Sequence, residues 1–179
     1  MKIVIATPLY PPDIEETAAY VKELARRLSL EHFVTIVAYG AIPEEVPSVR
    51  IVVVSKRLPI LLRLIAYTFA LMREARRANL IYAQNGASVE LPSAIATLIT
   101  RTPLIMHTAD PRAYQAAHQN LLRFLVQRSV YWLARVVVTD MPLPKPEILP
   151  FGPPANTAAF EESWKQHSQL LAASFTHGT

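Results

Sequence analysis

Three residues that could carry chemistry lie close together after one short apolar run. His107 ends the run Pro103–His107, and Asp110 and Arg112 follow it within five residues. The ordinary pKa of histidine, about 6.5, allows an imidazole to move protons near neutral pH. His107 is therefore the candidate catalytic residue, and Asp110 and Arg112 are candidate substrate-binding residues. The alternative is a histidine that only ends a strand, followed by the ordinary turn that an Asp-Pro pair favours.

A second turn supplies Asn85 and Gly86 as candidate substrate-binding residues. They follow the apolar run Leu80–Gln84, and Gly86 is one of only four glycines in the chain. A scarce glycine usually marks a place that needs a positive φ or a close approach. Gly86 therefore either admits a ligand or, in the interpretation that we favour, turns the chain from a strand into a helix.

The first loop, residues 8–16, adds Tyr10, Glu15 and Glu16 as candidate substrate-binding residues. The two glutamates stand directly before a helical pattern. Carboxylates at a helix N-terminus stabilise it by about 0.3–1 kcal/mol each, but they repel a phosphate there. The interpretation that we favour is that Glu15 and Glu16 only stabilise the helix start, and that binding of a diphosphate is weakened or lost.

Several kinds of site are not expected. The chain has no cysteine, and its five histidines lack metal-ligand spacing, so we predict no metal site and no disulfide. The phosphate-binding loop and dinucleotide glycine motifs are missing, as is the Gly-x-Ser-x-Gly elbow, so we expect no cofactor. Basic residues are not interleaved with aromatic ones, so no nucleic acid is expected as a partner.

The elements that must position these residues alternate along the chain. Continuous apolar runs predict strands that are covered on both faces, as in a parallel sheet, and helical patterns separate them. We expect a single α/β, Rossmann-like open parallel sheet of six to seven strands flanked by helices. The expected strands are Lys2–Thr7, Val34–Tyr39, Arg50–Val54, Leu80–Gln84, Pro103–His107, Arg135–Thr139 and a short seventh at Glu147–Phe151. The expected helices are Thr17–Leu30, Pro59–Ala78, Ser88–Thr100 and one within Pro111–Ala134.

Three segments, in this order, resemble the N-terminal half of family-4 glycosyltransferases with the GT-B fold. They are TPLYPPDIEETAAYVKELARRL, then LIYAQNGASVELPSAIATLITRTPLIMHTADP, then RVVVTD followed by EILPFG. The resemblance implies a Rossmann-like, acceptor-side domain over residues 1–152. Residues 153–179 are then a proline-rich connector and a C-terminal helix that packs back on the domain.

The resemblance also carries expectations about activity. It implies metal-independent, retaining hexosyl transfer, with His107 beside the reaction centre. Where the family has a pair of glycines, this sequence has Glu15 and Glu16. The half that binds the nucleotide-sugar in the family has no counterpart in these residues. We therefore expect no catalysis by the chain alone and a partner chain that supplies the donor site.

The composition leaves an alternative open. Charged residues make up 18% and hydrophobic residues 51% of the chain, so apolar surface should be exposed. The apolar helix Pro59–Ala78 is flanked by basic residues, so it either crosses over the sheet or lies on an anionic membrane. A non-catalytic module bound to a membrane surface or to a second copy is thus the alternative function. We expect a cytoplasmic location, with peripheral contact at the inner membrane surface through Arg57, Arg63, Arg73, Arg76 and Arg77.

Overall fold

Six parallel strands form one open sheet in the computed structural model of this chain, in the order β3-β2-β1-β4-β5-β6. The structure describes residues 1–12, 16–40, 42–108 and 111–139, together with residues 161, 164, 165, 168, 169, 172 and 173. The strands are β1 (Lys2–Thr7), β2 (Phe33–Gly40), β3 (Val49–Ser55), β4 (Leu80–Gln84), β5 (Leu104–Thr108) and β6 (Val136–Thr139). The helices are α1 (Glu16–Leu28), α2 (Ile60–Ala75), α3 (Ala87–Thr100), α4 (Pro111–His118) and α5 (Leu121–Leu133).

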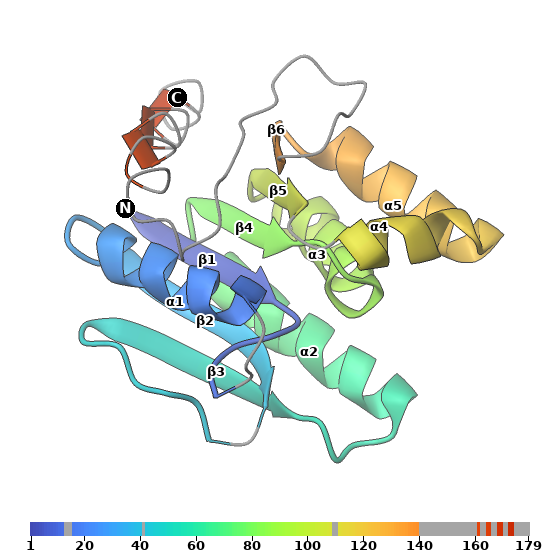
Figure 1. Cartoon of the computed structure of the whole chain (residues 1–179), viewed down its shortest axis with the longest axis horizontal. Coiled ribbons are helices and arrows are strands. Elements are labelled where there is room, and N and C mark those ends of the chain that lie inside the picture. Colours follow the sequence, from blue (N-terminus) through green and yellow to red (C-terminus); the bar gives the residue numbers. More distant parts are fainter. Residues whose placement is uncertain are drawn as a thin grey trace.

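Each face of the sheet has its own core, because successive side chains of a strand point to opposite faces. On one face, Ile3 and Ile5 of β1 pack with Val21 and Leu24 of α1. On the other face, Val4 and Ala6 join buried residues of α2, α3 and α5. Figure 1 shows α1 on the near side of the sheet, while α2 and α3 cross behind it. The sheet is therefore covered on both sides, which explains why its strands are continuously apolar.

The parallel sheet and its Rossmann-like class are confirmed, with two strands matching their expected bounds and the others within one residue at either end. One helix prediction needs correction, because the segment 111–134 forms two helices rather than one. Asn120 separates them: its side chain accepts hydrogen bonds from the backbone N–H groups of Leu122 and Arg123, at 3.0 and 3.2 Å. This side chain caps the N-terminus of α5, which is the usual role of asparagine at that position.

The described residues of the C-terminal segment lie on the α1 side. Trp164 is partly buried against the α1-side core, and the Arg27 guanidinium lies 5.5 Å from the centre of its ring. Arg27 also pairs with Glu161. The expected strand Glu147–Phe151 and the connector lie outside the described residues, so the division at residue 152 stays a prediction.

Candidate functional site

A row of side chains crosses the sheet near the carboxyl ends of its strands, where ligands bind in open α/β folds. Thr7 is level with Ala38 of β2, and Ala38 is level with Val53 of β3. On the other side of β1, the Thr7 hydroxyl lies 2.7 Å from Gln84 Oε1, and Gln84 pairs with His107 of β5. Neighbouring strands lie about 4.8 Å apart, so roughly 14 Å separates Ala38 from His107. The row therefore has two ends that cannot belong to one small binding site.

At one end, the ring of His107 lies on the face that α1 covers. Its centre is 4.8 Å from the ring of Tyr20 and 5.8 Å from the ring of Tyr82, and His107 is only 4% exposed. The hydroxyls of the two tyrosines lie 3.3 Å apart. Burial raises the pKa of Tyr20 and of Tyr82 above the ordinary value, so both hydroxyls stay protonated. In this structure, His107 belongs to an aromatic cluster that lies between α1 and the strands β4 and β5.

The turn from β4 to α3 lies beside His107. The backbone N–H of Asn85 donates to the His107 carbonyl at 2.8 Å. Gly86 has a φ of 148° and precedes the first residue of α3, and its own N–H donates to Glu90 Oε1 at 3.3 Å. Burial is the main reason that the pKa of the Glu90 carboxyl is raised. These contacts define a turn from strand to helix with a positive φ at Gly86. Such a turn agrees with the interpretation that we favour for this glycine.

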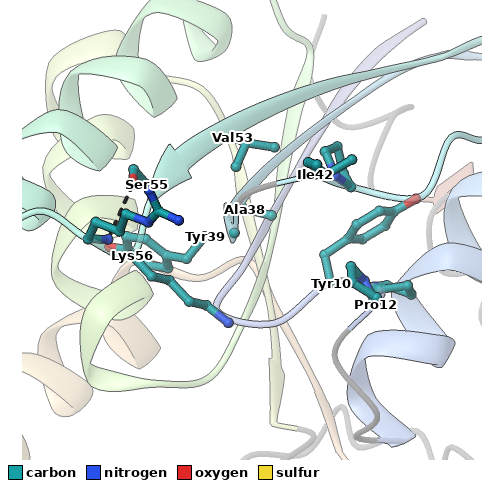
Figure 2. A pocket seen from close by; sticks show the side chains of 12 residues that line it. Tyr10, Pro12, Ala38, Tyr39, Ile42, Val53, Ser55 and Lys56 are labelled. Carbon is teal, nitrogen blue, oxygen red and sulfur yellow. Dashed lines mark hydrogen bonds between the residues drawn. The ribbon is translucent and has the colours of Figure 1, made fainter.

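At the other end, an open pocket of about 420 Å³ lies beyond β2 and β3. Figure 2 shows Tyr10 and Pro12 on one side of this pocket, Ser55 and Lys56 on the other, and Ala38 and Val53 between them. The loop from β1 to α1 supplies the first side, and the segment between β3 and α2 supplies the second. The pocket is thus built by three stretches of sequence that the strand order brings together. Its lining residues are Tyr10, Pro11, Pro12, Ala38, Tyr39, Gly40, Ile42, Pro43, Val53, Ser55, Lys56 and Arg57.

The pocket combines an apolar lining with a basic edge, and its two tyrosines are only 3% and 4% exposed. The Tyr10 hydroxyl donates to the Glu44 carbonyl at 3.1 Å, and the Tyr39 hydroxyl donates to the Ser88 carbonyl at 2.8 Å. Burial raises the pKa of both tyrosines to about 12, so neither ring carries charge at neutral pH. Lys56 and Arg57 are exposed at the rim. Such a site can contact an apolar part of a ligand through Ile42 and Val53, while Lys56 and Arg57 donate hydrogen bonds to hydroxyl or anionic groups.

The structure brings only some of the candidate residues together. His107, Asn85 and Gly86 are neighbours, whereas Tyr10 lies in the separate pocket. Glu15 and Asp110 lie outside the described residues, as do the side chains of Glu16 and Arg112. The roles proposed for all eight residues stay predictions.

Sequence reasoning missed Tyr39, Lys56 and the pair formed by Thr7 and Gln84. One signal could have found them, because all four stand at or just after the ends of expected strands. Which of them would share a pocket depended on the strand order.

Helix α2 leaves much of its apolar surface uncovered. Tyr67, Leu71 and Ala75 are buried against the sheet, but Leu61 and Phe69 are largely exposed. Of the five arginines proposed for membrane contact, Arg57, Arg73, Arg76 and Arg77 are exposed, and Arg63 is partly buried over the ring of Tyr39. The described helices include none that is long and apolar enough to cross a bilayer. Among the described side chains, no three His, Asp or Glu groups gather in a way that could hold a metal ion.

Comparison with known proteins identifies the fold. No protein-family model matches the sequence, and no curated protein matches it significantly. Among solved structures, Anabaena HepE in complex with UDP and glucose matches with a TM-score of 0.59 and 19% identity, over 91% of this chain and 41% of that one. A structure described as a UDP-N-acetylglucosamine 2-epimerase from Listeria monocytogenes matches with a TM-score of 0.62 and 12% identity, over 86% and 46%.

These likenesses show the fold alone, a Rossmann-like sheet of the kind found in GT-B-type glycosyltransferases and epimerases. The chain spans less than half the length of either structure. The described residues therefore correspond in extent to about one half of such a protein.

Proposed function

We propose that this chain is the acceptor-binding half of a sugar-transferring enzyme that resembles the family-4 glycosyltransferases. The pocket beyond β2 and β3 carries the proposal, because it combines an apolar lining with a basic rim at the ligand-binding edge of the sheet. The share of HepE that the chain matches, 41%, supports a half-enzyme, and HepE was solved with UDP and glucose. The finer assignment, to the N-terminal half, rests on the sequence resemblance.

The chemistry of the pocket suits a sugar-containing acceptor. Ile42 and Val53 offer apolar surface to the C–H face of a sugar ring, above the buried rings of Tyr10 and Tyr39. Lys56 and Arg57 offer hydrogen-bond donors to ring hydroxyls or to an anionic substituent. Ile42 is 82% exposed and stands at the rim, where an occupant would cover it.

Sugar transfer would need a donor half from outside these 179 residues. In the family, cations of the second half stabilise the leaving diphosphate, and a glycine pair in the first half lets it approach. Glu15 and Glu16 stand at the positions of those glycines and would repel a diphosphate. In the assembled enzyme, His107 would lie at the other end of the row from this pocket, where it would hydrogen-bond a hydroxyl of the donor sugar, as the resemblance implies.

Saturation-transfer NMR tests the acceptor site. The probes are a panel of p-nitrophenyl glycosides and, separately, UDP-glucose. We expect signal from at least one glycoside and none from UDP-glucose. The variants Ile42→Asp and Lys56→Ala should weaken the glycoside signal, because both residues are exposed at the pocket rim. The control Leu30→Asp is equally exposed but lies past the end of α1, at the opposite edge of the sheet, and should change nothing.

Two results would count against this function. Tight binding of UDP-glucose to the chain alone would mean that the donor site is present here. Glycoside signals that survive both pocket variants would place the acceptor elsewhere.

A second candidate is a non-catalytic module that binds a membrane surface or a second copy of the chain. The exposed Leu61 and Phe69 beside the arginines of α2 favour it. This candidate predicts no glycoside binding, together with either binding to lipid vesicles or a dimeric mass in sedimentation. A monomer that binds neither glycosides nor vesicles would contradict both candidates.

A further inference from the structure

The two sides of the pocket beyond β2 and β3 differ in charge. One side consists of Ser55, the last residue of β3, and of Lys56 and Arg57, which follow it. Figure 2 shows Ser55 and Lys56 on this side, with Tyr10 and Pro12 across from them. The opposite side carries no charged residue among those described: Tyr10, Pro11, Pro12, Ile42 and Pro43. The cationic groups of the pocket therefore lie on one side and face an apolar one.

Negative charge is scarce around this pocket. None of its described lining residues is Asp or Glu. Glu44 follows Pro43 of the apolar side, but its carboxylate pairs with Lys22 of α1. The first turn of α2, which comes directly after the cationic side, contains no acidic residue. Asp13 lies outside the described residues. The described lining thus carries a net positive charge.

A third cation, Arg63 of α2, supports the cationic side. Arg63 is partly buried, its guanidinium carbon lies 5.6 Å from the centre of the Tyr39 ring, and its Nη1 donates to the Lys56 carbonyl at 3.4 Å. Within the turn itself, the Arg57 N–H donates to Ser55 Oγ at 3.2 Å. Because the Ser55 oxygen accepts this bond, its own O–H can donate to a ligand. The turn is therefore held in place before a ligand arrives, which lowers the entropy lost on binding.

We propose that the acceptor bound in this pocket is a sugar that bears an anionic group, either a phosphate or a carboxylate. The proposal rests on the acceptor function proposed above and names the substrate class of the same site. Lys56, Arg57 and the Ser55 hydroxyl donate to the anionic oxygens, since hydrogen bonds between ionised partners are the stronger kind. Ile42 and Val53 contact the C–H face of the ring. A neutral sugar would use the same apolar surface but would not engage the positive charge.

Saturation-transfer NMR titrations with glucose 6-phosphate, glucuronate and glucose test the charge requirement, because the three sugars share a ring and differ in one substituent. We expect at least one of the two anionic sugars to bind about fivefold or more tightly than glucose, a modest factor for charged hydrogen bonds because the rim is exposed. This preference should shrink at high salt, which screens exposed charges. Arg57→Gln and Lys56→Gln should each remove most of the preference, while the affinity for glucose stays within about twofold, since glutamine keeps a hydrogen-bond donor.

Two matched comparisons separate charge from shape. Ile42→Asp and Ile42→Asn place side chains of nearly equal size at the same exposed rim position. The aspartate should weaken binding of the anionic sugar more than the asparagine does, because it repels an anion, whereas glucose should distinguish the two variants little. Arg128→Gln removes one positive charge from an exposed position on α5, outside the pocket, and should leave the preference unchanged.

The outcomes distinguish this proposal from the acceptor function itself. Equal affinities for glucose and for both anionic sugars would overturn the proposal and leave the acceptor function standing. A preference that survives both rim variants, or that Arg128→Gln reduces as much as they do, would also overturn it. Inorganic phosphate that competes as strongly as glucose 6-phosphate would show a site for small anions instead of a sugar site. Displacement of the anionic sugar by UDP-glucose at the same concentration, or binding of none of the three sugars, would contradict the proposal and the acceptor function together.

Discussion

Replacing Gly86 by alanine should destabilise the protein through its backbone. Gly86 has φ 148° and ψ 133°, a region that is open almost only to glycine and that costs other residues about 1–3 kcal/mol. An added Cβ would also lie 3.4 Å from Pro8 Cγ, so relaxation toward ordinary angles has little room. The Gly86 carbonyl accepts hydrogen bonds from the N–H groups of Val89 and Glu90, at 2.8 and 2.9 Å. A change of φ would disturb this first turn of α3.

The magnitude can be measured by thermal and urea unfolding. For a domain of this size, about 1 kcal/mol shifts Tm by about 2–4 °C, so we expect Gly86→Ala to lower Tm by roughly 2–12 °C. The matched control is Gly40→Ala at the end of β2. There an added Cβ would meet only Val53 Cγ1 at 3.6 Å, an ordinary contact, and φ is not positive. The stability of this control should stay within about 1 kcal/mol of the wild type.

Equal stability of the two variants would refute the reasoning that the turn requires glycine. If Gly86→Ala folded with unchanged stability but lost glycoside binding, the glycine would serve the close approach of a ligand. That outcome would restore the interpretation that we favour less.

Three further predictions concern stability. Burial raises the pKa of Glu90 above its ordinary 4.5, so the stability that its protonated form contributes is complete below about pH 4.5 and is lost as pH rises through the higher folded value. Glu90→Gln should therefore gain stability over the wild type between acid and neutral pH, and parallel curves of Tm against pH would contradict this. Tyr67→Phe should cost about 0.5–1.5 kcal/mol in urea unfolding, because its buried hydroxyl donates to the Val37 carbonyl at 2.8 Å; an unchanged midpoint would argue against that bond. Removal of residues 156–179 should lower Tm, since Trp164 packs against the α1-side core, whereas Glu161→Gln should change it little because the Glu161 carboxylate is exposed. An unchanged Tm of the truncated chain would show that this packing does not stabilise the domain.

The sequence alone determined the class of fold. Strands covered on both faces must be apolar at nearly every position. Runs such as Lys2–Thr7 and Leu80–Gln84 could therefore be identified as strands without any tertiary information, and their bounds were predicted correctly. The break at Asn120 was missed because the helical pattern continues across it. Asparagine caps a helix only when its side chain reaches the backbone N–H groups that follow, which the pattern does not reveal.

Tertiary structure alone decided which residues share a site. Tyr10, Ala38, Val53 and Lys56 form one pocket because β3 pairs with β2 and β2 with β1. The same order separates Tyr10 from His107, although both lie near the carboxyl end of a strand in the sequence. Composition showed an excess of apolar residues, but the packing of α2, α3 and α5 on one core decided which of them are buried and which stay exposed. The physical reason is that periodicity along a chain specifies local structure, whereas proximity between distant segments depends on how the strands pair.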